Sequence, residues 1–83
     1  MNKDIYKTSD LNIAAYLKAR FRLDVAGSER DKNGRVFFIF NTSKVDIDSI
    51  INDYINGKDL CSINLFTREL VGLRVVIRNL QQN

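Results

Sequence analysis

Residues 36–40, VFFIF, form the most apolar run of the chain. Successive side chains of a β-strand point to opposite faces, so this run divides into two sets. One face would hold Val36, Phe38 and Phe40. The other face would hold Phe37 and Ile39. The run predicts a strand over residues 35–40 with apolar side chains on both faces, and it raises the question of what covers the second face.

Two further strands are predicted beside this one. Residues 5–7 are a short extended candidate, and Leu23 and Val25 alternate with polar or small neighbours as in a half-buried strand. Residues 28–34 are polar and contain an Asn-Gly pair, which tolerates the positive φ of a tight turn. Because this segment is longer than a two-residue hairpin turn, the sequence predicts a loose, exposed loop there.

The first helical pattern covers residues 11–21. Thr8, Ser9 and Asp10 precede it, and their side-chain oxygens can accept the free N–H groups of a first helical turn. At 100° per residue, one side of this helix gathers Leu11, Ile13, Ala14, Leu17 and Phe21. Tyr16 falls at the border of that side. The pattern predicts a helix with one buried stripe.

Two more helices are predicted in the second half of the chain. Asp46 is the expected N-cap of the first of them, and Gly57 is its expected stop. Its apolar positions are Ile47, Ile50, Ile51, Tyr54 and Ile55. The last helix begins near Asn64 and has a continuous apolar seam, formed by Phe66, Leu70, Leu73, Ile77 and Leu80. The order β-α-β-β-α-α predicts one α+β domain over residues 1–83, a small antiparallel sheet with helices packed on it.

Composition is that of an ordinary folded domain, with 45% apolar and 28% charged residues. The net charge of +3 is unevenly spread. Residues 45–60 carry one lysine against four aspartates, which gives −3, and residues 61–83 carry three arginines against one glutamate, which gives +2. No apolar stretch approaches the roughly 18 residues of a membrane span. The N-terminal residues lack the apolar run of a secretory signal, and the lone cysteine suits a reducing compartment, so we expect a cytoplasmic protein with no membrane contact.

Catalytic chemistry has few candidates in this chain. There is no histidine, the commonest general base and metal ligand. Cys61 therefore has no histidine partner, and we expect it to be a small buried hydrophobic residue. Asp46 and Asp48 are two residues apart and would point to different sides of a helix, so capping explains them better than a carboxylate pair. We expect no enzyme, no cofactor and no bound metal.

Nucleic-acid binding is the alternative interpretation. RNA-recognition domains have the order β-α-β-β-α-β and stack bases on aromatic residues of their central strands. Laid on the third-strand pattern of those domains, residues 33–40 match at Gly34, Phe37 and Phe40. Asn33 stands where that pattern has a basic residue, and Arg35 replaces an aromatic. Tyr6, on the first predicted strand, is a candidate second stacking residue. With so few matches, nucleic acid is not the favoured partner.

The favoured interpretation is that protein covers both faces of this strand. Tyr6, Arg35, Phe37 and Ile39 are the candidate contacts for a protein partner, for self-association or for nucleic acid. Three things could cover Phe37 and Ile39: the last helix, side chains of a neighbouring strand, or a second copy of the chain. The seam of the last helix needs an apolar surface to pack on, so we expect that helix to cover them. Phe37 should then be largely removed from solvent and Ile39 at least half buried; failing that, a dimer is expected.

Four segments together resemble one family: YKTSDLNIAAYL, GRVFFIF, IINDYINGK and INLFTRELVGLRVVI. The resemblance is to a small family of uncharacterised bacterial proteins, a domain of unknown function whose members are often carried by phages and conjugative elements. It covers residues 5–77. The first helix of the family tends to end in a glycine, where this sequence has Arg20-Phe21-Arg22. The resemblance implies the fold and a non-enzymatic binding or accessory role in a mobile genetic element, and it implies no catalytic residue or cofactor.

Overall fold

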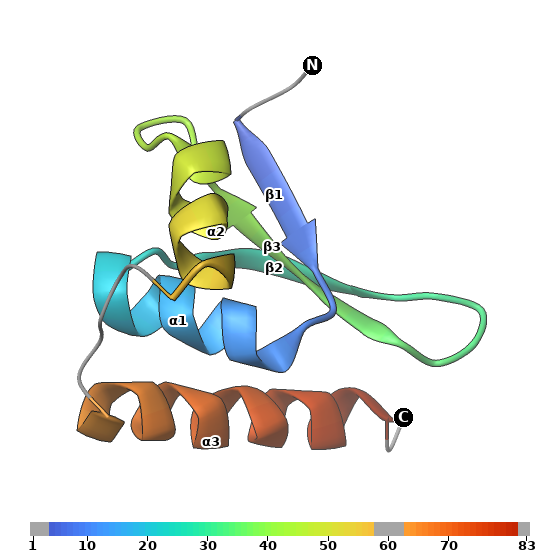
Figure 1. The fold of residues 1–83 in the computed structure, drawn as a ribbon. Coiled ribbons are helices and arrows are strands. Elements are labelled where there is room, and N and C mark those ends of the chain that lie inside the picture. The colour runs from blue at the N-terminus through green and yellow to red at the C-terminus, as the bar shows by residue number, and fades with distance from the viewer. Residues whose placement is uncertain (1–3, 58–62, 82–83) are drawn as a thin grey trace.

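A computed structural model describes residues 4–57 and 63–81. The elements are β1 (Ile5–Thr8), α1 (Leu11–Phe21), β2 (Val25–Arg30), β3 (Val36–Asn41), α2 (Ile47–Ile55) and α3 (Ile63–Gln81) (Figure 1). The strands form one antiparallel sheet, and the order β-α-β-β-α-α is the predicted one. The α+β class is therefore confirmed. None of these helices is long and apolar enough to cross a membrane.

The sheet has the order β1-β3-β2, so the strongly apolar β3 lies in the centre. It pairs antiparallel with both neighbours, with Tyr6 opposite Phe40 on one side and Ser28 opposite Phe38 on the other. The two outer strands are consequently parallel to each other, and α1 makes the connection between them. A bulge interrupts the β2 ladder between Val25 and Gly27.

The prediction of a loose, exposed loop at residues 28–34 is wrong. Strand β2 continues to Arg30, and the chain then reverses in a tight turn. Asp31 closes this turn, because its Oδ1 accepts the backbone N–H groups of Asn33 and Arg35, each at 2.9 Å. Gly34 has φ of 84°, the left-handed conformation that glycine tolerates best. The end of β2 is polar because it is an exposed edge strand, so hydrophobic alternation did not reveal it.

Helix α1 has the predicted bounds, and its cap is Asp10. The Asp10 Oδ1 accepts the N–H groups of Asn12 at 2.9 Å and Ile13 at 3.1 Å. The helix ends at Arg22, which adopts a left-handed φ of 55°. A glycine is the usual residue in this position, because it adopts the left-handed conformation without strain.

The core of the fold surrounds α1 on several sides. Four consecutive α1 residues, Ala14, Ala15, Tyr16 and Leu17, are buried, and together they span a full helical turn. The expectation that Tyr16 lies at the border of a single stripe is therefore wrong. Its ring packs on Tyr54 of α2, with centroids 4.8 Å apart. The sheet contributes Val36, Phe38 and Phe40 to the same core.

Helices α2 and α3 begin close to the predicted residues. Asp46 caps α2 through a 3.2 Å bond from the Ser49 N–H, and Gly57 follows that helix with φ of 67°. On α3, Leu73 is buried in the core, and the other seam residues pack against it half-buried: Phe66, Leu70, Ile77 and Leu80. Figure 1 shows α3 lying along α1, and its C-terminal end also reaches the sheet, because Arg30 Nη1 of β2 donates to the Leu80 carbonyl at 3.2 Å. Cys61 lies outside the described residues.

Tyr54 gives the fold a predicted pH dependence. Burial raises the pKa of its phenol above the ordinary 10.0, and the nearby Asp10 carboxylate adds to the rise. The unfolded chain therefore loses this proton first as the pH increases, so stability should fall as pH passes above the ordinary value. Denaturant unfolding at about pH 8 and about pH 11 should show a smaller alkaline loss in Tyr54→Phe than in the natural protein. Equal losses of stability in the two proteins would show that Tyr54 has the same pKa in the folded and the unfolded state.

Candidate functional site: the uncovered face of the sheet

The strand register defines a second face of the sheet. Paired residues of an antiparallel ladder have side chains on the same face. Lys7 pairs with Ile39 and Glu29 pairs with Phe37, so side chains from all three strands meet there. We call this surface the open face, and it comprises Ile5, Lys7, Gly27, Glu29, Phe37, Ile39 and Asn41. Ile39 lies beside Gly27, because a Cβ built on that glycine would be 3.9 Å from Ile39 Cδ1.

None of the described helices packs on the open face. All three helices contribute to the cluster around Phe38 and Phe40, on the other side of the sheet (Figure 1). The prediction that the last helix covers Phe37 and Ile39 is therefore wrong. Both residues are half-buried, with the larger part of each removed from solvent, so the expectations for the burial of Phe37 and of Ile39 are both confirmed. Ile5, on the adjoining strand, is 49% exposed.

An ion pair crosses the open face. Lys7 on β1 and Glu29 on β2 lie on opposite sides of the central strand, and Lys7 Nζ is 3.1 Å from Glu29 Oε2. The pair therefore spans β3 at the level of Phe37 and Ile39. The register places Lys7 beside Ile39 and Glu29 beside Phe37, where the aliphatic stems of long charged side chains can cover apolar surface. Because both members are about half exposed, the pair adds little stability and can separate when a partner binds.

The electrostatics of the open face are nearly balanced. Glu29 places a carboxylate beside Phe37, and the same carboxylate accepts a hydrogen bond from Lys7. Arg35 is exposed at the start of β3 and adds one cation at the hairpin end. A phosphate chain stacked on Phe37 would meet this carboxylate, so the surface suits an apolar or mixed-charge partner better than a polyanion.

Tyr6 does not join the other candidate contacts. It pairs with Phe40 and packs half-buried against the core, so its side chain belongs to the helix-covered side of the sheet. Tyr6 and Phe37 therefore cannot form one stacking platform, which corrects the sequence-based pairing of the two. The strand order matches that of RNA-recognition domains as far as β3, but within residues 4–57 and 63–81 no fourth strand is present.

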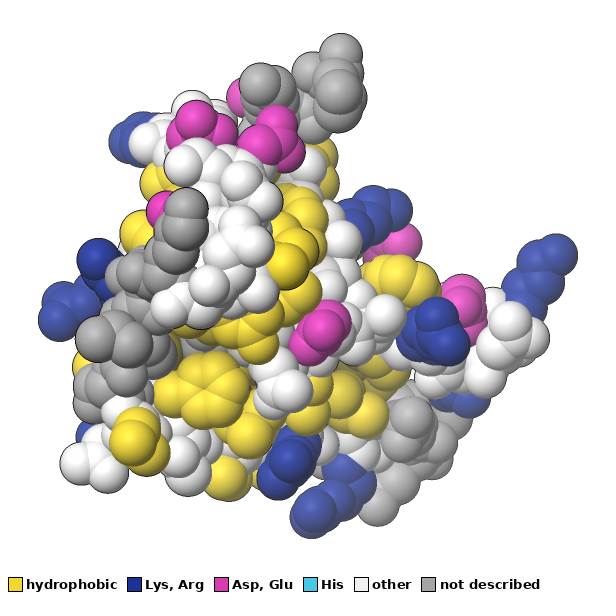
Figure 2. Space-filling view, viewed as in Figure 1, with side chains coloured by type: hydrophobic (Ala, Val, Ile, Leu, Met, Phe, Trp, Pro, Cys, Tyr) yellow, Lys and Arg dark blue, Asp and Glu magenta, His cyan; other side chains and the backbone are white. Residues whose placement is uncertain are grey.

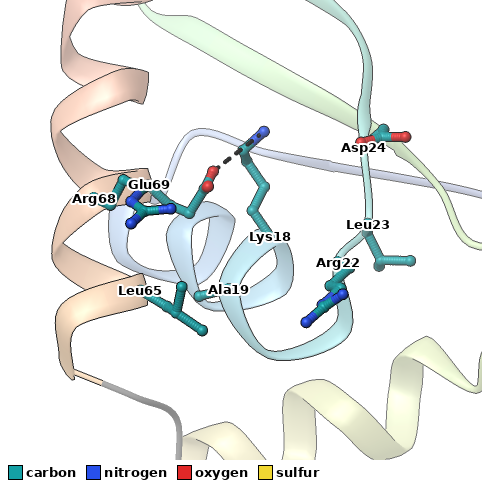
Figure 3. Close-up of a pocket in the computed structure, with 8 residues that line it drawn as sticks. All are labelled: Lys18, Ala19, Arg22, Leu23, Asp24, Leu65, Arg68 and Glu69. Atoms are coloured by element: carbon teal, nitrogen blue, oxygen red, sulfur yellow. Dashed lines mark ion pairs between the residues drawn. The ribbon is translucent and has the colours of Figure 1, made fainter.

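A second feature is a hollow between the end of α1 and the first half of α3, with a volume of about 330 Å³ (Figure 3). The hollow is crossed by an ion pair, Lys18 Nζ to Glu69 Oε2 at 3.3 Å. Asp24 points away from that pair in Figure 3, so the two carboxylates do not act together. In the described part of the chain no three histidine, cysteine, aspartate or glutamate side chains gather closely enough to hold a metal ion. The hollow therefore offers charges but no assembled reactive group.

Five residues of the open face were missed by sequence reasoning: Ile5, Lys7, Gly27, Glu29 and Asn41. The alternation of residues 5–7 places Ile5 and Lys7 on one side of a strand, and this signal was available. Their position beside Phe37 and Ile39 depends on the ladder register, which the sequence does not specify. Glu29 was hidden in the segment predicted as a loop.

Comparison with known proteins places the chain in a family. No match was found among curated proteins or among solved structures. Residues 3–80 match a family defined by a domain of unknown function, which is almost the whole chain and includes every strand of the open face. The chain therefore belongs to the DUF5659 family, a domain of unknown function.

Proposed function

We propose that the protein is a non-enzymatic, cytoplasmic protein-binding module, and that the open face is its binding surface. The observation that carries the proposal is the position of Phe37, Ile39 and Ile5. These three large apolar side chains share a sheet face on which no described helix packs. Apolar surface that a small domain leaves uncovered is a common mark of an interaction site.

The size of the open face indicates a modest interface. Three strands about 4.8 Å apart and about four residues long make a footprint of about 200 Å². A standard stable interface uses about 800 Å² on each partner. The open face alone therefore supports weak or transient binding, and a tighter partner would also contact the neighbouring hairpin or the exposed edge of β1.

Nucleic-acid binding is the second candidate, and one observation favours it. Phe37 lies on the central strand at a position where RNA-recognition domains stack a base. Against it stands Glu29, whose carboxylate lies next to Phe37 and neutralises Lys7. Stacking platforms for single strands combine aromatic residues with a basic groove. The balanced charge of the open face supports the protein-binding proposal instead.

The proposed setting is that of an accessory protein of a mobile genetic element. This part of the proposal is supported by the resemblance of four sequence segments to proteins carried by phages and conjugative elements. The genes that flank family members provide the test. Recurrent neighbours with phage or conjugation functions are expected, and neighbours drawn only from housekeeping operons would contradict the setting.

Site-specific photo-crosslinking in the native host tests the binding surface. A benzophenone amino acid at position 37 should form adducts with a discrete protein partner. The same amino acid at position 55 is the matched control, since Ile55 is apolar and 69% exposed on α2. The Ile39→Asp substitution should abolish the adduct at position 37. Adducts of equal yield at both positions, or adducts with nucleic acid at position 37, would refute the proposal.

A further inference from the structure

Helix α3 presents a second surface, independent of the open face. At about 100° per residue, Val71 and Val75 each lie about 160° from the buried Leu73. They are 53% and 44% exposed, in agreement with that position. Arg68 and Arg78 fall on opposite flanks of the two valines, about 140° from Leu73, and Arg74 lies beside Arg78 on one flank. We call the valines and the three arginines the α3 outer face.

The arginines of this face carry uncompensated positive charge. All three are exposed, and no ion pair is formed by any of them within the described ranges, although Arg68 also lines the hollow that holds Glu69 (Figure 3). The single acidic residue of α3, Glu69, points to the other side and is held by Lys18. Figure 2 shows Lys and Arg side chains projecting at the edge of the molecule where α3 lies, as they do at other edges, and a group of Asp and Glu side chains around α2. The α3 outer face is therefore a short apolar stripe between cations.

Self-association through this surface is disfavoured by its charges. An antiparallel two-fold pairing centred on Leu73 would place Val71 of one copy against Val75 of the other, which is sterically reasonable. The same symmetry would place Arg68 against Arg78 twice. A parallel pairing would set each arginine against its own copy. Like charges in both arrangements oppose binding, so the occupant must carry negative charge.

We propose that the α3 outer face binds an acidic amphipathic helix of a partner protein. Such a helix presents one or two apolar side chains to Val71 and Val75 and flanks them with carboxylates for the arginines. The two valines argue against a nucleic-acid backbone, which gains nothing from apolar contacts at this position. They also argue against a lipid surface, because the stripe offers neither aromatic nor long apolar side chains for insertion. The proposal concerns a different surface from the open face, and its failure would leave the proposed function untouched.

A designed peptide tests the proposal. The probe is a fluorescein-labelled helical peptide of about 18 residues, with two leucines four residues apart and glutamates on both sides of them. Fluorescence anisotropy should show micromolar binding, weaker by about tenfold or more when NaCl rises from about 50 to about 500 mM. A peptide of the same composition with the glutamates and leucines scrambled around the helix should bind about tenfold more weakly.

Charge exchange identifies the surface. Arg74→Glu with Arg78→Glu should reduce binding of the acidic peptide about tenfold or more, and the Arg74→Gln, Arg78→Gln protein should show a smaller loss. The control, Lys32→Glu with Lys44→Glu, changes net charge equally on exposed residues outside α3 and should bind within about twofold of the natural protein. A peptide with lysine in place of glutamate should prefer the Arg→Glu protein. Circular dichroism must show unchanged folding of each variant.

Three results would overturn the proposal. The first is equal binding of the acidic peptide and its scrambled form. The second is a loss of binding in the Lys32, Lys44 control as large as that in the arginine variant. The third is tighter binding of a mixed-sequence single-stranded oligonucleotide or of anionic phosphatidylserine vesicles than of the peptide, with loss of that binding in the arginine variant. The last result would assign the α3 outer face to a polyanion or a membrane surface.

Discussion

Replacing Phe38 with alanine is expected to lower the free energy of unfolding by about 3–5 kcal/mol, the usual cost of deleting a buried phenylalanine. Phe38 is 1% exposed and lies on the central strand, where its side chain reaches the core beneath the helices. The substitution removes a large apolar surface and leaves a cavity that rigid neighbours on β1 and β2 cannot fill. Equilibrium urea unfolding followed by circular dichroism measures the loss.

Phe37→Ala is the matched control, since it changes the same residue type on the same strand but on the open face. Its cost should be about 1 kcal/mol, a typical value for a single substitution. Should Phe38→Ala prove too unstable to measure, Phe38→Leu gives a smaller loss at the same position. If the Phe37 variant proves as destabilised as the Phe38 variant, the sheet is buried equally on both faces and the open face does not exist.

Leu73→Ala is expected to cost about 2–5 kcal/mol, the usual range for a core leucine. Leu73 is 3% exposed and joins the cluster formed by α1 and β3, so it anchors α3 to the domain. The neighbouring seam residues are only half-buried and offer less compensation. Thermal and urea unfolding of the variant measure the change.

Val71→Ala serves as the comparison on the same helix. Val71 is exposed, and alanine has the higher helix propensity, so its stability should stay within about 0.5 kcal/mol of the natural protein. A cost below about 0.5 kcal/mol for Leu73→Ala as well would show that α3 is detached from the domain in solution. Helix α3 would then be an arm available to a partner.

The helices could be predicted well because their signals are local. Asp10 and Asp46 cap α1 and α2 with side-chain oxygens, and Gly57 follows α2 in a left-handed conformation. These residues act on the backbone next to them, whatever the tertiary structure. The seam of α3 likewise follows from helical periodicity. This periodicity predicts that the seam packs on an apolar surface, but it does not specify which surface.

The extent of β2 could not be predicted in the same way. Ser28, Glu29 and Arg30 form a strand because they pair with β3, and their side chains carry no apolar alternation. An edge strand obtains its structure from the ladder hydrogen bonds of its neighbour. The signal for residues 28–30 therefore lay in β3, not in their own sequence.

The placement of α3 was wrong because apolar periodicity does not choose between two apolar surfaces. With a single buried stripe on α1, the sequence leaves Phe37 and Ile39 as the apolar surface for the seam. In the structure Ala15 and Tyr16 are buried as well, so α1 is apolar around a full turn and receives the sheet, α2 and α3 on different sides. Small alanine side chains beside the apolar stripe of α1 allow other elements to pack closely against the helix. These alanines were the sequence signal for burial on more than one side.

The candidate site was predicted in part. Phe37 and Ile39 follow from strand alternation and do share one face, but Tyr6 faces the core and the Lys7–Glu29 pair depends on register. The side chains of β1 and β2 that lie next to Phe37 and Ile39 can be identified only after the three strands are paired. Sequence alone therefore identified the apolar centre of the open face and missed its charged border.

Solvent paramagnetic relaxation of side-chain protons tests most directly whether the open face is uncovered. With a soluble gadolinium chelate, the Phe37 ring and Ile39 methyl protons of the dilute protein should relax markedly faster than those of Phe38 and Leu73. Nuclear Overhauser effects should connect Leu73, and not Phe37, to α1. The account is contradicted if Phe37 and Ile39 are as protected as Phe38 at every protein concentration and show Overhauser contacts to α3.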